Sequence, residues 1–516
     1  FWPAHEPAQI EFGEWDWVLI TDFENRSGEE VLDGIGEYAL ARELANSGYV
    51  KVAPQGRVQD ALRLMRLPPD SPIDLAVGRE ISLRDGGIRM LITGRVEKLG
   101  NTYRISAELV SPADGVTLAS FSAEARSQDD ILSQVAALAH DVRVALGESL
   151  ASIQASEEML AKVTTPSLEA LRLYSEAEAI MRGPERNRAV ALLDQALRLD
   201  PDFASAHVLL SYVLRDRNEY ERSREQVRRA VELADQATER ERLFILATNY
   251  RYLEDLQQEI ETYELLVRLY PDHTWANGNL ALIFAWQGRF ADALPPRIGA
   301  AEVVPNNFFA QYLTSVYAAA AGEPEQAEFF MGRANALVGN TPWMQSMSWF
   351  LPIQSAWMAG DNAAASRRTE ALISELSPEQ LLENGRLYND ARSMFLSLGQ
   401  LERFRELSRL RPEKGWLEAF LDYESGNPET LERYLEAQDE GFWMAVLMAM
   451  TGQTERARTL IEDPRSAEAL PPPDLVRDWN NLARGQLALA QGQYERAVEL
   501  LSRETRVLFI SAPYAH

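Results

Sequence analysis

The spacing of hydrophobic and polar residues divides the chain into two kinds of sequence. Over residues 1–160, short stretches that alternate with a period of two are interleaved with stretches of helical period. β-Strands are predicted at residues 18–20, a short buried run, at 49–53, and at 90–97, 102–110 and 116–123, which alternate with a period of two. The stretches of helical period predict helices, at residues 33–47, 57–66, 73–87 and 128–154. This order predicts a compact α/β domain, in which helices cover one mixed sheet.

Beyond residue 164 the strand pattern disappears and helical periods continue. Four pairs of small residues or prolines are each separated by 34 positions: Gly288 and Gly322, Ala293 and Ala327, Ala300 and Ala334, and Pro271 and Pro305. This period is that of the tetratricopeptide repeat, in which small residues lie where two helices cross and a proline ends the second helix. Further copies, of less regular length, extend to the segment GQYERAVELL at residues 492–501.

The predicted fold is therefore an α/β N-terminal domain with a mixed sheet, followed by an all-α tetratricopeptide-repeat superhelix (solenoid). We expect three domains: the α/β domain over 1–160, regular repeats over 161–340, and irregular repeat-like helices over 341–516. The repeats indicate helix packing rather than chemistry, so the architecture by itself predicts only a generic binding function.

Charge and composition narrow the classes of partner. The formal net charge is −27, and no basic patch offsets it, so the chain is expected to repel nucleic acid. An acidic surface favours solubility and also attracts basic peptides. Cysteine is absent, which excludes thiol nucleophiles, disulfides and thiolate metal sites. The longest apolar run, at 443–450, is shorter than the ~18 residues that a membrane helix needs.

The segment DWVLITDFENRSGEE at residues 16–30 has the form of a strand that enters a glycine-bearing loop, as many phosphate sites do. A phosphate-binding loop of the Walker type needs a lysine, and this loop has none and is rich in carboxylates. Gly34 and Gly36 lack the third glycine of a dinucleotide fingerprint. We therefore expect a structural turn, in which Asp22 accepts hydrogen bonds from amides near residues 25–28.

Other motifs give no sign of catalysis. No two of the five histidines stand at helical i, i+3 or i, i+4 spacing, and no Gly-x-Ser-x-Gly motif occurs. We predict no catalytic residues, no metal and no cofactor in this segment, which is expected not to be an enzyme.

The inner helices of the repeats are the place where specificity is expected. Aligning the chain on the 34-residue period places a stripe of aromatic residues, with two arginines near its start, along a concave groove. Such residues are typical anchors of protein and peptide contacts. The alternative is that half of them belong to the core, because a register error of one residue turns a groove residue inward. The predicted groove residues are Tyr212, Arg215, Phe244, Arg251, Tyr252, Trp275, Trp286, Phe309, Tyr312, Phe350 and Trp357.

Two motifs in the first domain carry a resemblance to a known family. A strand ends in DFENRSG at residues 22–28, and ITGRVEKLG follows at 92–100. Together with the segment at 164–177 that leads into the repeats, these resemble the TolB amino-terminal-like α/β domain that precedes tetratricopeptide arrays in bacterial signalling proteins. The sequence is most similar to the region after the membrane helix of bacterial serine/threonine protein kinases. Similar regions also follow winged-helix regulators and adenylate cyclases.

The resemblance implies a non-catalytic sensor or scaffold region that binds a protein or peptide. It implies a location on the extracytoplasmic (periplasmic) side of a bacterial inner membrane, with a cytoplasmic location as the alternative. Kinase motifs are absent from this sequence, which begins at Phe1, so we expect a leader or an upstream membrane helix and effector domain. Binding would signal through repeat curvature or through association of two copies as a homodimer. The alternative is an assembly adaptor with no signalling output.

Overall fold

The structure is a computed structural model that describes residues 12–153, 165–181, 188–411 apart from positions 218, 254 and 340, and shorter stretches between 419 and 501. It contains two compact units: residues 1–277 with 302–306, and residues 278–301 with 307–516. The α/β domain and the first repeats thus belong to one unit. The expected domain boundaries at 160 and 340 stay a prediction.

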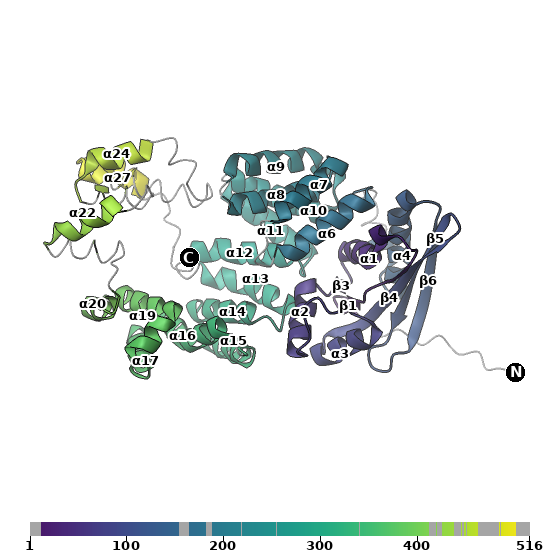
Figure 1. Cartoon of the computed structure of the whole chain (residues 1–516), viewed down its shortest axis with the longest axis horizontal. Helices are drawn as coiled ribbons and strands as arrows, with labels where there is room; N and C mark the ends of the chain where they lie inside the picture. The colour runs from purple at the N-terminus through teal and green to yellow at the C-terminus, as the bar shows by residue number, and fades with distance from the viewer. Residues whose placement is uncertain are drawn as a thin grey trace. The chain divides into compact units, whose positions relative to one another are not determined.

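The α/β domain is built on one mixed sheet, as the sequence predicts (Figure 1). Its strands lie in the order β3-β1-β4-β5-β6. β1 is parallel to β3 and to β4, and the β4–β5 and β5–β6 pairs are antiparallel. The strands are β1 (Trp17–Ile20), β3 (Lys51–Val52), β4 (Ile88–Leu99), β5 (Thr102–Val110) and β6 (Thr117–Ala125).

Helices cover both faces of this sheet. Because side chains alternate along a strand, Val18 and Leu19 of β1 point to opposite faces, and both are fully buried. Val18 packs in the core beneath α1 (Ile35–Ala45) and α4 (Ile131–Ala145). Leu19 packs in a second core with α2 (Gln55–Leu64) and α3 (Leu75–Asp85). Short 3₁₀ helices precede two of these helices: η1 (Glu30–Leu32) and η2 (Gln128–Asp130).

The segment after β1 differs from the predicted turn. It contains a further strand, β2 (Glu24–Arg26), which pairs in parallel with Arg95–Glu97 of β4. β4 is twelve residues long and β1 only four, so the end of β4 extends past β1 and offers free backbone groups to β2. The expected role of Asp22 is also wrong: its Oδ2 accepts from the backbone N of Ile73 at 2.8 Å. Asn25 closes the turn instead, accepting from the backbone N of Ser27.

The remainder of the first unit consists of helix–turn–helix pairs. In each pair the two helices pack on one another along their length. The pairs are α6 (Leu168–Ile180) with α7 (Ala189–Leu199), α8 (Ala204–Asp216) with α9 (Tyr220–Leu233), and α10 (Glu239–Tyr252) with α11 (Leu256–Leu269). A 3₁₀ turn, η4 (Ala234–Gln236), joins α9 to α10. These are tetratricopeptide repeats, in which the first helices of successive pairs form the inner layer.

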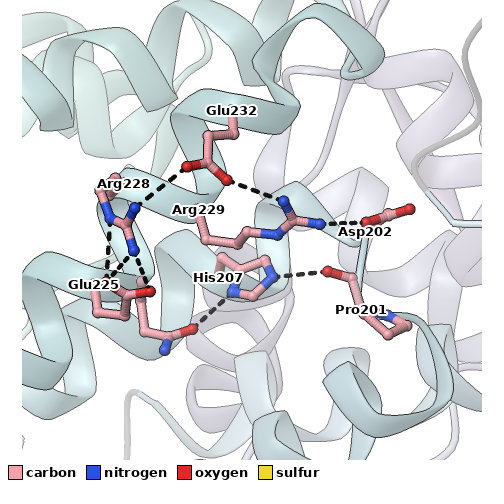
Figure 2. A network of polar contacts seen from close by, with 8 residues as sticks. Pro201, Asp202, His207, Glu225, Arg228, Arg229 and Glu232 are labelled. Carbon is pink, nitrogen blue, oxygen red and sulfur yellow. Dashed lines mark hydrogen bonds and ion pairs between the residues drawn. The ribbon is translucent and has the colours of Figure 1, made fainter.

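Charged residues form a network on the outer helix of the second pair, and one ion pair joins this helix to the turn before α8 (Figure 2). Arg229 of α9 contacts Asp202 at 2.6 Å and Glu232 at 3.0 Å, and Arg228 contacts Glu225 and Glu232. Beneath them, the ring nitrogens of His207 lie 2.7 Å from Oε1 of Gln226 and 3.0 Å from the carbonyl oxygen of Pro201. His207 is thus occupied by structural contacts. The ion pairs are exposed, so solvent screens them and they add little to stability.

The repeats continue through α12 (Thr274–Trp286) and α13 (Phe290–Val303) into the second unit. There α14 (Phe308–Ala320) packs on α15 (Pro324–Ala336), and α16 (Pro342–Met358) on α17 (Asn362–Ser374). Less regular helices follow: α18 (Pro378–Glu383), α19 (Gly385–Ser397), α20 (Leu401–Ser408), α22 (Pro428–Ala437), α24 (Thr454–Glu462) and α27 (Tyr494–Leu501).

The positions that reveal the period have the structural roles expected of a tetratricopeptide repeat. Gly288 and Gly322 lie in the turns between paired helices with φ of 71° and 80°, a left-handed conformation that glycine adopts without strain. Ala327 and Ala334 of α15 are buried where the helices meet. The 34-residue spacing therefore reflects a repeated turn and a repeated helix crossing.

Candidate functional site: a cavity lined by the inner repeat helices

The first unit contains a cavity of about 710 Å³ between the α/β domain and the repeats. From the α/β domain it is lined by the residues that follow β1 and β3 and by one face of α1. From the repeats it is lined by α6, α8, α10 and the start of α12, which are all first helices of their pairs. The carboxyl ends of parallel strands are a common place for ligand sites in α/β sheets. The volume is in the range of small-molecule and side-chain pockets.

A group of polar side chains joins the two walls of this cavity. Arg42 of α1 pairs with Glu241 of α10, although the two residues are 199 positions apart in sequence. Tyr38, one turn before Arg42, donates its hydroxyl to Glu178 of α6 at 2.7 Å. Arg240 donates a hydrogen bond of 2.9 Å to the carbonyl oxygen of Ala45, at the end of α1. The same guanidinium donates to Asp272, also at 2.9 Å. The α/β domain is thus fixed to two different repeats, through α6 and α10.

The charge of Arg42 helps to keep the carboxyl group of Glu241 ionised. Burial by itself favours the neutral form of Glu241, which is also held by Ser205 and by the helix cap Thr238. The charge of Arg42 and these hydrogen bonds outweigh the effect of burial, so the pKa of Glu241 lies below its usual value. The guanidinium of Arg42 also lies 5.2 Å from the ring centre of Tyr174. The pair is therefore ionised and well packed.

Glu37, on the cavity face of α1, is in the opposite situation. Its Oε2 is buried and has no hydrogen-bond partner among the described residues. Burial raises the pKa of Glu37 to about 7, and the nearby negative charges of Asp22 and Asp33 act in the same direction. The carboxyl group therefore lies where a positive charge would stabilise it and where the described residues supply none.

Three aromatic side chains form a continuous wall on the repeat side. The ring of Tyr212 lies 6.0 Å from that of Phe244 and 5.6 Å from that of Trp275, measured between centroids. His273 extends this wall, with its ring 5.1 Å from Phe244. Burial and the charge of Arg240 lower the pKa of His273 well below its usual value, so the imidazole is neutral. Trp275 remains 45% exposed, which leaves a large apolar surface open to a ligand.

The structure therefore brings together three of the groove residues predicted from the sequence: Tyr212, Phe244 and Trp275 line one cavity. Three others from the same unit lie outside its lining. Arg215 stacks over Tyr212 at 5.0 Å, and Tyr252 shares a hydrogen bond of 2.6 Å with Ser223. Arg251 is buried and pairs with Glu259 at 2.8 Å, so it packs between α10 and α11.

The remaining predicted groove residues belong to the second unit. Phe309 stacks on Tyr312, and the Tyr312 hydroxyl donates to Gln354. Phe350 is buried in a core in which Trp357 also packs, partly buried. Trp286 is partly buried as well. Whether any residue of the stripe binds a ligand stays a prediction.

The charged residues of the cavity were not predicted. Glu37, Tyr38 and Arg42 lie on a helix whose amphipathic pattern is ordinary, and their partners lie in a distant part of the sequence. The only local signal is the placement of Tyr38 and Arg42 four residues apart, on one face of the helix.

The described residues offer neither a metal site nor a membrane-spanning helix. Within the described residues, no group of three or more His, Asp or Glu side chains is arranged to hold a metal ion. None of the helices that the structure describes combines the length and the hydropathy of a membrane-spanning segment.

Comparison with known proteins gives only distant likenesses. No protein-family model and no curated protein matches the sequence. Among solved structures, PilW, described as a widely conserved type IV pilus biogenesis factor, is 18% identical over 40% of this chain and 92% of its own, with a TM-score of 0.31. A tetratricopeptide repeat protein from Parabacteroides merdae is 15% identical over 47% of this chain and 99% of its own, with a TM-score of 0.28.

A further match concerns a domain rather than a repeat protein. The C-terminal domain of LpoB from Escherichia coli is 18% identical over 22% of this chain and 83% of its own, with a TM-score of 0.20. All these scores are too low to carry a conclusion about function. The tetratricopeptide fold of this chain is established by its own helix pairs, turns and spacing, and such arrays are typically protein-interaction scaffolds.

Proposed function

We propose that this chain is a non-catalytic scaffold that binds a polypeptide segment at the inner helices of its first repeats. The observation that carries the proposal is the wall of Tyr212, Phe244 and Trp275, which faces a cavity of about 710 Å³. Aromatic side chains lose little conformational entropy on binding and provide large contact areas, which makes them common anchors of protein contacts. The α/β domain closes the other side of the cavity and so limits which segments fit.

Site-specific photo-crosslinking tests this proposal. A benzophenone amino acid replaces Trp275 in one variant and Glu221, an exposed residue of α9, in a control. We expect a polypeptide to be crosslinked from position 275, and the crosslink to be lost when Phe244→Ala is added. The proposal is wrong if position 275 captures no more polypeptide than position 221, or if the Phe244→Ala change has no effect.

The finer proposal is that this scaffold is the sensor region of a membrane-tethered bacterial serine/threonine kinase, on the extracytoplasmic side. The sequence motifs at 22–28 and 92–100 and the order of an α/β domain followed by repeats support it. The coding sequence upstream of Phe1 tests it, since a membrane helix and kinase motifs are expected there. A winged-helix or adenylate cyclase domain in that position would assign the chain to one of those regulators instead.

An assembly adaptor without signalling output is the other candidate, because repeat scaffolds of this kind also hold complexes together. Native mass spectrometry of the chain with the partner that crosslinking identifies, now without the crosslink, distinguishes an adaptor from a sensor. An adaptor is expected to co-purify with its partner at a fixed stoichiometry. A sensor is expected to bind its ligand reversibly. Addition of the ligand is expected to change its association with other copies of the chain or the hydrogen exchange of its backbone amides.

A further inference from the structure

The charges around the cavity are strongly unequal. Its lining includes seven carboxylates and two guanidinium groups, those of Arg42 and Arg240. Both guanidinium groups are already engaged, Arg42 with Glu241 and Arg240 with Asp272 and a backbone carbonyl. No cation of the lining therefore remains to meet an anionic ligand, and the carboxylates outnumber the cations. The field inside the cavity repels anions and attracts cations.

One of these carboxyl groups has a buried oxygen without a hydrogen-bond partner among the described residues. Oε2 of Glu37 is buried and receives no hydrogen bond from the described residues, whereas Glu178 and Glu241 are held by Tyr38 and Arg42. A buried acceptor without a donor has lost its hydrogen bonds to water and gained none from the protein, which is unfavourable. A cationic donor entering from the ligand would remove this cost and would form a charge-assisted hydrogen bond.

The aromatic wall suits the same kind of ligand. Lysine and arginine bury their alkyl stems on apolar surfaces while their charged ends pair with acids. Cations are also attracted to the faces of Trp and Tyr rings. The exposed ring of Trp275 offers such a surface on the same cavity that Glu37 lines.

Building on the proposed function, we propose that the bound segment enters the cavity through a basic side chain, a lysine ammonium or an arginine guanidinium. The carboxylates of the cavity, Glu37 among them, hold its charge, and the wall of Tyr212, Phe244 and Trp275 holds its stem. The cavity is therefore expected to bind polypeptide segments that contain a lysine or an arginine in preference to others. The shared chemistry, an alkylammonium or guanidinium group, also occurs in free polyamines, and the test includes them.

The test uses the full chain and a library of short peptides whose central residue is fixed as Lys, Arg, norleucine or Glu, with the other positions randomised. Norleucine keeps the stem of lysine and removes its charge. We expect Lys and Arg peptides to bind at least about tenfold more tightly than norleucine peptides, the effect of one charge-assisted hydrogen bond. Glu peptides are expected to bind most weakly.

Three variants locate the effect. Glu37→Gln is expected to reduce the preference for Lys over norleucine about tenfold, since it removes the negative charge at the buried oxygen that has no hydrogen bond. Glu176→Gln, on the α6 side of the cavity, is expected to reduce it less and serves as a second probe that does not alter α1. Glu80→Gln is the control, because Glu80 lies on α3, pairs with Arg84 and does not line the cavity. Circular dichroism verifies that each variant is folded.

The outcomes separate this inference from the proposed function. Equal binding of Lys and norleucine peptides, or a preference unchanged by both Glu37→Gln and Glu176→Gln, overturns the basic-side-chain proposal and leaves the scaffold function standing. Binding of spermidine that depends on Glu37, with no peptide bound, supports the cation site and overturns the polypeptide ligand. If neither the peptides nor spermidine bind, both proposals fail.

Discussion

Replacing Glu37 by glutamine is expected to stabilise the α1 region at neutral pH. In the folded chain the pKa of Glu37 is raised from 4.5 to about 7, mainly because burial disfavours the charged form. The folded state therefore binds the proton more tightly than the unfolded state does. Stability from this group is complete below about pH 4.5 and is lost as the pH rises through 7. Glutamine does not titrate, so the variant escapes this loss.

The two pKa values give the size of the effect. Their difference corresponds to roughly 3 kcal/mol at pH values above 7, and to a slope of about 1.4 kcal/mol per pH unit between them. Glu43 of the same helix also has a pKa raised to about 7, by burial and by the charge of Glu241. The wild-type chain is therefore expected to lose stability through both groups, and the Glu37→Gln variant only through Glu43.

Hydrogen exchange of the α1 amides, followed by mass spectrometry on the full chain, measures this local stability. The free energy of opening is compared between variant and wild type at about pH 5 and about pH 8, after correction for intrinsic exchange. We expect the difference to grow toward the higher pH by up to about 3 kcal/mol. Glu80→Gln, on the exposed face of α3, should show no such growth. A difference that is the same at both pH values would refute the account of Glu37 given above.

Three further changes test other parts of the structure. Arg42→Met should lower the free energy of opening of α10 by about 3–5 kcal/mol, because it leaves Glu241 charged and buried without its cation. Hydrogen exchange of the α10 amides measures this, and an unchanged exchange rate would contradict the prediction. Gly322→Ala should lower the stability of the second unit in thermal unfolding by about 1–2 kcal/mol, because Gly322 has a φ of 80°. The matched Gly332→Ala, inside α15, should raise this stability by roughly 1 kcal/mol, because alanine favours helix more than glycine does. Changes of equal sign in the two variants would argue against the left-handed turn. Ala334→Leu should cost about 1–3 kcal/mol in the same thermal measurement, since the added atoms enter a fully buried helix crossing, and a stabilised variant would mean that the crossing is loosely packed.

The sheet and the repeats are predictable because their signals are local. Val18 and Leu19 belong to one short apolar run, and the small residues of each helix crossing recur every 34 positions. β2 escapes prediction because Glu24, Asn25 and Arg26 are polar and become a strand only by pairing with the overhanging end of β4. Strand pairing of that kind depends on the partner rather than on the segment itself.

The candidate site is predictable only on its repeat side. The 34-residue period places Tyr212, Phe244 and Trp275 on inner helices, where the structure has them. The opposite wall comes from α1, and its contacts join residues such as Arg42 and Glu241 that are far apart in sequence. No periodic pattern in one sequence encodes such a pairing. That these carboxylates gather around one cavity is therefore seen only in the folded chain.

The long separation of the two walls also sets an order of events during synthesis. Helix α4 of the α/β domain ends at Ala145, whereas the aromatic wall is complete only once Trp275 has been added, 130 residues later. At about 5–20 residues per second, the ribosome needs roughly 7–26 seconds to make that stretch. During that time Tyr38 lacks its acid until Glu178 has been made, and Arg42 lacks its acid until Glu241 has been made. A nascent chain therefore displays a cationic, aromatic helix face that the mature protein conceals, and molecules near the ribosome have several seconds in which to meet it.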